Sequence, residues 1–377
     1  MSDRKENVDE KSIRDRIRTA FAEAAVLAEQ RGARRERPIE DILYGDVPTF
    51  MELPLADGPE ALAGADAVVL GFGYEGITIK TPSLSAPPTV SRPRPGSIYW
   101  RMGADFAPAA IRKASIFYSV HHNRGHFPEI DPELVLMDEL KLVDYGDIDV
   151  LPGNTRETLR RASAKVSDIV AAGALPILLG GDHTTSYPAL RAIAEKAKRR
   201  IGVISFDAHM DLSITPEYWA STEWVKAFET GNVDPENFVE IGIRSNRSTL
   251  FERALARSLG IRVMTIDEVK ASGAEAAVRE AIRIAGRGTD AIYVSLDIDV
   301  MEPALVPAQK APEIWGLTID EIMTSLRLLS RERLAGFDVC EMTPDYDINA
   351  MGAQFCARAV VEILGGLAVR KRGAQRR

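Results

Sequence analysis

Short apolar runs alternate with longer amphipathic stretches along most of the chain. Runs rich in Val, Ile and Leu predict buried strands over residues 175–179, 202–206 and 291–296. Apolar residues at helical spacing predict helices over residues 9–32, 107–115, 155–172, 186–198, 274–286, 318–330 and 349–367. This alternation is typical of an α/β fold with three layers, in which helices cover both faces of a central, mainly parallel sheet.

One large domain, residues 65–367, accounts for most of this alternation. Residues 1–64 precede it as an extension with an amphipathic helix, and we expect the basic residues 368–377 to form a solvated, frayed tail. Between residues 76 and 95 the chain is rich in Pro, Ser and Thr, which favours an ordered excursion or loop. No internal repeat and no second domain is evident.

Acidic and imidazole side chains follow each of the three apolar runs. Because the carboxyl ends of parallel strands share one edge of a sheet, we expect these side chains to converge. A buried, ionised Asp is too costly to keep unless it is paired or binds a metal. The oxygen and nitrogen donors suffice for two divalent ions if some carboxylates bridge. The predicted ligands are His183, Asp207, His209, Asp211, Asp297 and Asp299.

Each of these clusters alone has an ordinary alternative. The segment from Asp207 to Asp211 is compatible with a solvated turn, and that from Asp297 to Asp299 with a turn that caps a helix. His183 alone is compatible with a structural histidine. Their joint occurrence favours the metal site, because the chain has only five histidines and two of them stand beside acids after apolar runs.

Composition and charge narrow the class of protein. With 377 residues, of which 45% are hydrophobic and 27% charged, the chain is long enough for one large core. Its net charge of −8 argues against nucleic acid as a partner. No apolar run approaches the roughly 20 residues of a membrane helix, and the polar N-terminus argues against a secretory signal. Cys340 and Cys356 lack metal-binding spacing, so we expect buried thiols and a cytoplasmic protein.

Four motifs resemble those of the ureohydrolases, the family of arginases and agmatinases. Gly180-Gly-Asp-His183, Ser205-Phe-Asp-Ala-His-Met-Asp211 and Ser295-Leu-Asp-Ile-Asp-Val-Met-Glu-Pro303 are similar to its first three motifs in order, and Glu341-Met-Thr-Pro344 to the fourth. Further similarity in residues 103–112, 143–149 and 239–244 extends it over residues 65–367. The resemblance implies an arginase-like catalytic domain in which the six residues above bind two ions, Ni(II) or Mn(II).

The resemblance also implies a reaction. A hydroxide held between two divalent ions would attack the central carbon of a guanidine-type group. This planar cation is a poor electrophile, so the site also needs a carboxylate to orient it and a proton for the departing amine. By resemblance Glu341 orients the cation and Asp211 relays the proton. The alternative for Glu341 is a surface loop acid.

Two segments depart from the family pattern. Arginases and agmatinases carry a histidine in the loop after the second motif, whereas residues 212–228 contain none. The stretch after the third motif is altered as well, to Ala308-Gln-Lys-Ala-Pro312. We interpret these changes as a rebuilt substrate pocket with an aromatic rim, suited to a flat cation; the alternative is ordinary core or subunit-interface aromatics. The aromatics concerned are Tyr218, Trp219, Trp224 and Trp315.

Three further histidines cluster in residues 117–127, at positions 121, 122 and 126. Imidazole titrates in the range that proton transfer requires, so one of them, with His122 as the candidate, would replace the missing proton shuttle at the substrate site. The alternative is an exposed polar loop or an oligomer contact.

Three functions are compatible with the sequence. The first is hydrolysis of a guanidine-type C–N bond in a small compound without an amino-acid group, such as guanidine or the biguanide metformin, because the extension and rebuilt loops resemble guanidine and metformin hydrolases. The second is an agmatinase or guanidinobutyrase that releases urea. The third is a weakly active subunit beside a paralogue. Family resemblance implies a trimer or hexamer, or a hetero-oligomer.

Overall fold

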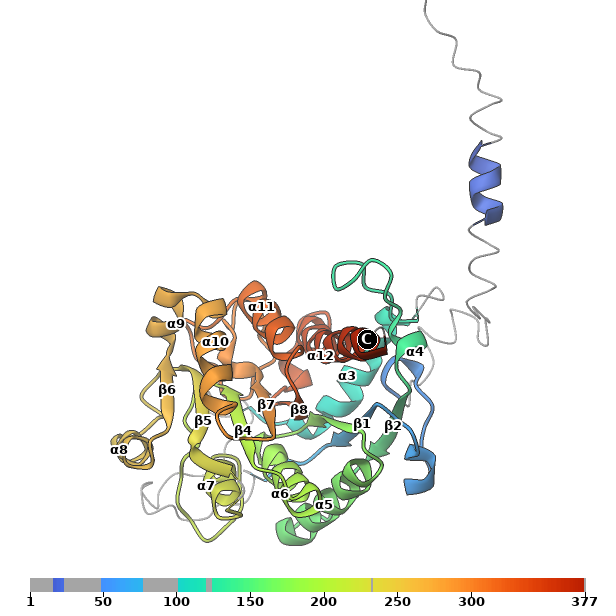
Figure 1. Ribbon diagram of the computed structural model, residues 1–377. Coiled ribbons are helices and arrows are strands. Elements are labelled where there is room, and N and C mark those ends of the chain that lie inside the picture. Colours follow the sequence, from blue (N-terminus) through green and yellow to red (C-terminus); the bar gives the residue numbers. More distant parts are fainter. Residues whose placement is uncertain (1–15, 24–48, 77–100, 120–123, 232, 376–377) are drawn as a thin grey trace, which may run out of the picture.

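A computed structural model describes residues 16–23, 49–76, 101–119, 124–231 and 233–375. At its centre is a sheet of eight strands in the order β2-β1-β3-β8-β7-β4-β5-β6, and every neighbouring pair is parallel (Figure 1). The strands are β1 (Ala67–Phe72), β2 (Leu142–Asp147), β3 (Leu175–Gly180), β4 (Ile201–Phe206), β5 (Val233–Ile243), β6 (Arg262–Thr265), β7 (Ala291–Asp297) and β8 (Leu334–Cys340).

Helices cover both faces of this sheet. The longer ones are α3 (Ala107–Ser115), α5 (Thr155–Ala171), α6 (Ser186–Ala197), α8 (Leu250–Leu259), α10 (Ala274–Ala285), α11 (Ile319–Leu329) and α12 (Met351–Gln375). The shorter ones are α4 (Leu136–Glu139), α7 (Glu223–Phe228) and α9 (Ile266–Ser272). In Figure 1 helices α5, α6 and α7 lie below the sheet, and α3, α10, α11 and α12 lie above it.

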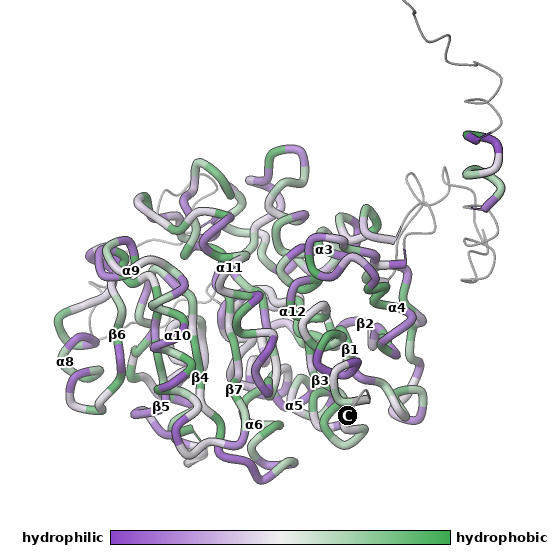
Figure 2. The backbone as a smooth tube through the Cα atoms, turned by 45° about the horizontal axis from the view of Figure 1, so that its top comes forward, coloured by the Kyte–Doolittle hydropathy of each residue, from purple (hydrophilic) through white to green (hydrophobic). Residues whose placement is uncertain are grey.

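Successive side chains along each strand point to opposite faces of the sheet, so the hydrophobic core consists of two clusters, one on each face. On β1, Val69 packs into the cluster that contains α3, α10, α11 and α12, whereas Val68 and Leu70 pack into the cluster with α5 and α6. This is the period of two that a strand buried on both faces requires. Helices α10 and α11 show hydrophilic and hydrophobic residues in alternation, as expected for helices with one buried side (Figure 2).

The predicted fold class is confirmed. The apolar runs 175–179, 202–206 and 291–296 lie in β3, β4 and β7, and five of the predicted helices coincide with α3, α5, α6, α10 and α11 to within a residue or so at each end. Capping boxes fix the starts of α8, α9 and α11, where Thr249, Thr265 and Thr318 each pair with a Glu three residues later.

The basic tail was wrongly expected to fray. Helix α12 continues through it to Gln375 because it is anchored on the core: Ala368 is fully buried, and Lys371 Nζ lies 2.6 Å from Asp66 Oδ2. At the other end, residues 16–23 are helical and exposed. The rest of the predicted helix 9–32 and residues 77–95 lie outside the described residues, and the domain boundaries stay a prediction.

Helix α12 contradicts the expectation that no apolar run approaches the length of a membrane helix. Residues Met351–Ala374 are long and apolar enough to cross a membrane by length and composition, with a mean hydropathy of 1.4. However, 78% of this window is buried within the fold. Its contacts are with α3 and α11 above the sheet, so α12 serves as a core helix.

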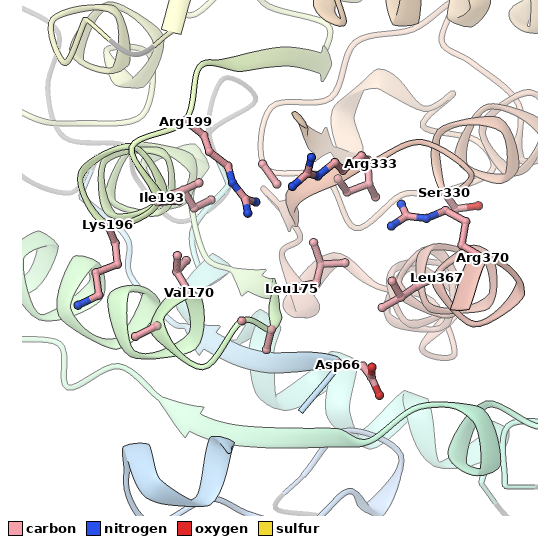
Figure 3. A pocket seen from close by; sticks show the side chains of 16 residues that line it. Asp66, Val170, Leu175, Ile193, Lys196, Arg199, Ser330, Arg333, Leu367 and Arg370 are labelled. Carbon is pink, nitrogen blue, oxygen red and sulfur yellow. The ribbon is translucent and has the colours of Figure 1, made fainter. Parts of the chain in front are cut away.

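A hollow of 680 Å³ opens at the amino ends of β3 and β8, the edge opposite to the predicted ligands (Figure 3). Lys196, Arg199, Arg333 and Arg370 line it, around an apolar floor that includes Leu175. Helices α5, α6 and α11 end at this edge. Cations there offset the partial negative charge of the helix carboxyl ends, so the basic lining has a structural reason.

Gly181 joins three strand ends at the opposite, carboxyl edge of the sheet. Its N–H donates to Phe72 O at 2.7 Å, and its carbonyl accepts from Glu341 N–H at 2.8 Å. A Cβ on Gly181 would lie 2.1 Å from Tyr74 O and 2.7 Å from Tyr74 N, which leaves no room for a side chain. The absence of a side chain at this position therefore sets how closely β1 approaches the segment that carries His183.

We predict that Gly181→Ala destabilises the fold by about 1 to 3 kcal/mol, because backbone atoms of Tyr74 have to move. Thermal unfolding measures the effect. Gly373→Ala is the matched control: its Cβ would meet nothing within 4 Å on α12, so no loss of stability is expected. Equal melting temperatures for Gly181→Ala and the wild type would contradict the close approach.

Candidate metal centre

The six predicted ligands meet at the carboxyl edge of the four central strands. His183 begins the turn η6 (His183–Thr185) after β3, and Asp299 lies in η7 (Ile298–Val300) after β7. Asp207, His209 and Asp211 directly follow β4. Because β3, β8, β7 and β4 are neighbours, residues from distant parts of the chain come within a few ångströms of one another.

Three carboxylates surround one nitrogen of His183. Its Nδ1 lies 3.1 Å from Asp207 Oδ2, 3.2 Å from Asp211 Oδ2 and 3.4 Å from Asp297 Oδ2. His183 is fully buried, and Asp207 and Asp297 are almost so. Asp211 is the most accessible of these side chains, with 15% of its surface exposed.

A second group forms around His209 and shares a carboxylate with the first. His209 Nδ1 lies 3.0 Å from Asp299 Oδ2 and 3.6 Å from Asp207 Oδ1. Asp207 therefore directs one oxygen toward each imidazole. The two groups, His183 with Asp207 and Asp211, and Asp207 with His209 and Asp299, each have donor atoms within 4.8 Å of one another, a spacing that fits a metal ion.

Buried polar atoms without partners also fit this assignment. Among the described residues, His183 Nδ1 and Asp207 Oδ2 make no hydrogen bond of normal geometry. Polar atoms left so at full burial are costly, and a cation between them removes the cost. Imidazole nitrogen and carboxylate oxygen suit Mn(II), and imidazole also suits Ni(II). The donor set therefore fits two divalent ions.

The titration of these groups follows from their crowding. Burial, together with the charges of Asp299 and Asp211, raises the pKa of Asp207 to about 7. Burial acts to lower the pKa of His183, but the surrounding acidic groups outweigh it and raise that pKa well above its usual value. Without a metal, protons must neutralise the cluster, and divalent cations would replace them.

A relay of hydroxyl and carboxylate groups orients His183. Its Nε2 lies 3.0 Å from Ser295 Oγ, and this hydroxyl donates to Asp338 Oδ1 at 2.7 Å. Since Ser295 gives its single hydrogen to Asp338, it accepts from Nε2–H of His183. The lone pair of Nδ1 is thereby left facing the carboxylates, as a metal ligand requires.

Arg244 holds the segment around Asp299. Its buried guanidinium donates to six backbone carbonyls, of which the nearest are those of Asp299 at 2.7 Å, Glu313 at 2.7 Å and Ile314 at 3.0 Å. The Asp299 carboxylate accepts from the Ala208 N–H at 3.0 Å. Arg244 therefore couples the third motif to Glu313 and Ile314, which directly follow the altered stretch 308–312.

Glu341 lies beside the first ligand and is not a surface acid. It is 5% exposed, and its Oε1 accepts from the backbone N–H of His183 at 2.7 Å. Its φ of 62° is in the left-handed region, which a residue with a side chain rarely adopts. Burial raises the pKa of Glu341 to about 8, although the neighbouring Lys310 acts to lower it.

Sequence reasoning missed a buried lysine next to Glu341. Lys310 is fully buried, its Nζ lies 2.6 Å from Glu75 Oε1, and its N–H donates to Glu341 O at 2.9 Å. Burial acts to lower the pKa of Lys310, but Glu341, Asp182 and Glu75 together raise it. In the sequence, only the altered stretch 308–312 pointed to a change at Lys310. Nothing in it indicated that Lys310 would be buried or that Glu75 would be its partner.

Tyr218 and Trp219 lie in the loop between Asp211 and α7. The Tyr218 ring packs against Tyr187 of α6 with 5.3 Å between centroids, and Trp219 Nε1 donates to Thr215 Oγ1 at 3.2 Å. Both side chains are partly exposed. A contact with substrate stays a prediction for both.

The two other tryptophans differ in position. Trp315 is 62% exposed, and its Nε1 lies 3.2 Å from Asp267 Oδ1 on α9, so its substrate contact also stays a prediction. For Trp224 the rim position is wrong, and the alternative of an ordinary core aromatic is confirmed. Trp224 is 1% exposed and packs edge-on against His183, with 5.2 Å between ring centroids, because α7 turns its ring into the core.

His122 and its neighbour at position 121 lie outside the described residues, and His126 Nε2 pairs with Pro132 O at 2.9 Å. Both cysteines are free and buried, as expected. The fold nevertheless brings Cys340 into a group with His183 and Asp297, which its position in the sequence did not indicate.

The chain combines an arginase-like parallel sheet with a cluster of carboxylates and imidazoles at its carboxyl edge. This combination defines a class of metal-dependent hydrolases, and comparisons with known proteins agree with it. The model of the arginase family matches residues 92–365. Guanidinopropionase of Pseudomonas aeruginosa is 33% identical over 326 residues, which cover 85% of this chain and 92% of that protein.

Solved structures give the same result for the fold. Proclavaminate amidino hydrolase of Streptomyces clavuligerus superposes with a TM-score of 0.72 at 29% identity, over 87% of this chain and 99% of that one. Formiminoglutamase of Trypanosoma cruzi, solved with Mn²⁺, has a TM-score of 0.68 at 23% identity, over 86% of this chain and 100% of that one. The chain belongs to the arginase family. It is a ureohydrolase, an enzyme of linear amidine C–N bonds.

We predict that Ser295→Ala lowers the affinity for Mn²⁺ about 10- to 100-fold, because His183 loses the acceptor that fixes its tautomer. Titration of metal-free protein in competition with a chelator measures this. Ser325→Ala is the control, since Ser325 is equally buried but donates to Glu321 O within α11. An unchanged affinity in Ser295→Ala would contradict the relay.

Proposed function

We propose that this ureohydrolase cleaves a guanidine-type C–N bond in a small compound without an amino-acid group, with guanidine or a biguanide such as metformin as the preferred class. Two divalent ions held by the six ligands take part. The observation that carries the proposal is the pair of donor groups joined by Asp207, with Glu341 buried beside them.

The bound ions would depress the pKa of a water molecule between them and so supply a nucleophile near neutral pH. The chain's own residues then orient the substrate. Glu341 has one oxygen fixed by the His183 N–H, so its carboxylate is held in place to accept from the planar N–H edge of a guanidinium. Such positioning lowers the barrier by holding the reacting carbon in place.

Asp211 is suited to move the proton. It is the most accessible ligand side chain, at 15% exposure, and its Oδ2 lies on the His183 side of the cluster. From there it would accept a proton from the attacking water and pass it to the departing amine. Hydrolysis then yields the amine and the corresponding urea.

Lys310 supports a small substrate. Its buried side chain takes up space beside Glu341, and its ammonium offsets part of the negative charge of Glu75, Asp182 and Glu341. A substrate with an α-carboxylate and an α-amino group would need polar partners in the same region. The loop after Asp211 lacks the family's histidine and carries aromatic side chains and a proline, with Tyr218 and Trp219 partly exposed.

A second candidate class is the guanidino acids. The similarity to guanidinopropionase over 85% of this chain favours it. Agmatinase or guanidinobutyrase activity belongs to the same set of alternatives, as does a weakly active subunit that pairs with a paralogue. The metal is proposed to be Mn(II), on the donor chemistry and on the Mn²⁺ named for formiminoglutamase, with Ni(II) as the alternative.

A substrate panel tests the proposed function. Protein reconstituted separately with Mn(II) and Ni(II) is assayed with guanidine, metformin, 3-guanidinopropionate, 4-guanidinobutyrate, agmatine and arginine, and the release of urea, guanylurea and amine is measured. We expect kcat/KM for arginine to be at least about 10-fold below that of the best substrate. Arginine as an equal or better substrate would refute the proposed class, and a guanidino acid as the best one would favour the second candidate.

Glu341→Gln preserves shape but removes the charge that orients the cation. We predict a loss of about 2 to 4 kcal/mol in transition-state stabilisation, or about 30- to 1000-fold in kcat/KM, with the metal content unchanged. Kinetics and metal content are measured on the same sample, with the exposed Asp320→Asn as the control. Activity lost only together with the metal would instead make Glu341 a structural support.

A further inference from the structure

Glu223 is a buried acid beside the metal centre that the sequence motifs do not include. It begins α7, within the loop that lacks the family's histidine, and only 1% of its surface is exposed. Its Oε2 accepts from the Ser221 N–H at 2.7 Å. Its Oε1 has no hydrogen-bond donor among the described residues. A buried carboxylate oxygen without a donor costs free energy, and a cation bound to it would offset this cost.

Oε1 of Glu223 points into the group around His183. It lies 3.7 Å from His183 Nδ1, close to the 3.1 to 3.4 Å at which the three Asp oxygens surround the same nitrogen. For ligand bonds of about 2.1 Å, adjacent ligands in an octahedron lie about 3.0 Å apart and opposite ones about 4.2 Å. The 3.7 Å from Glu223 lies between these two values, within the range that the ligands of one ion span.

The backbone before Glu223 holds it in this position. Ser221 has a φ of 104°, a value that residues with a side chain rarely adopt, and its N–H is the group that fixes Oε2. Ser221 O in turn accepts from the Ser213 N–H at 2.8 Å, which closes the loop. Strain of this kind persists where the surrounding structure overrides it, as at binding sites.

The charges of the neighbouring acids also favour a cation beside Glu223. Glu223 Oε1 and Asp211 Oδ2 lie 3.7 Å and 3.2 Å from the same nitrogen, His183 Nδ1, and two carboxylates on one side repel each other unless a proton or a cation lies between them. A divalent ion on the His183 side would satisfy both acids as well as the imidazole.

We propose that Glu223 is a further ligand of the divalent ion on the His183 side, in addition to the six residues of the family motifs. The inference rests on the proposed dinuclear site. An added carboxylate makes this position harder and more anionic than the one around His209, and carboxylates suit Mn(II) better than they suit Ni(II). The two positions should therefore differ in affinity, with the His183 side the tighter one for Mn(II).

Metal titration of Glu223→Gln tests this ligand without relying on activity. The variant keeps the shape of the side chain and removes its charge. In competition with a chelator, we expect one of two Mn²⁺ binding steps to weaken at least about 10-fold, the other to stay as in the wild type, and Ni²⁺ binding to suffer less. Glu217→Gln is the matched control, because Glu217 is an exposed acid of the same loop.

Two results would overturn the inference, and they are distinguishable. Wild-type protein that binds no divalent ion would refute the proposed dinuclear site itself. Two ions bound with wild-type affinity in Glu223→Gln would refute only the role of Glu223. Should that variant fail to fold, a crystal structure of the Mn²⁺-loaded wild type decides: Glu223 Oε1 within about 2.5 Å of an ion supports the assignment, and a longer distance overturns it.

Discussion

The repulsion among buried carboxylates is the constraint on which the rest of the structure depends. Asp207, Asp211, Asp297 and Asp299 converge on two imidazoles at one edge of the sheet, where burial prevents water from screening them. Only protons or cations can offset this charge. The hydroxyl relay behind His183, the carbonyl contacts of Arg244 and the close approach at Gly181 hold the donors in place. The fold thus supplies a rigid frame around a centre that is not stable without positive charge.

The parts of this centre that follow directly from the sequence are local ones. A ligand placed just after an apolar run is predictable, because the run becomes a strand and its end fixes the position of the next residues. His183, Asp207 and Asp299 were predicted as ligands in this way, and the structure places them in groups whose spacing fits a metal ion. Five helices were predicted closely from apolar spacing alone, whereas α8 and α9 were missed although a Thr cap and a Glu three residues later mark their starts. The strands β1, β2, β5, β6 and β8 were not predicted. Of these, β6 is short, and β2, β5 and β8 carry the buried acids Asp144, Glu240 and Asp338, which interrupt the apolar pattern, whereas β1 is an apolar run that was overlooked.

Residues whose roles depend on distant partners were not predictable. Lys310 looks like a surface residue until the fold places Glu75 from the end of β1 against it. Glu223 belongs to no motif and becomes significant only because α7 packs beside His183. The basic charge of the tail alone predicts a frayed end. Contacts with Asp66 and the core instead extend helix α12 through it. Lys310 and Glu223 lie in the two altered segments, so for them the sequence marked the places of change but not their consequences, whereas the extension of α12 lies in neither segment.

The central claim is that Asp207 joins two metal positions into one centre. Native mass spectrometry of protein reconstituted with Mn²⁺, compared with Asp207→Ala, tests it most directly, since each carboxylate oxygen faces a different imidazole. The account predicts two ions per wild-type chain and weakened binding of both ions in the variant. Loss of a single ion in Asp207→Ala, with the other bound at wild-type affinity, or a wild type that binds fewer than two ions, would contradict it.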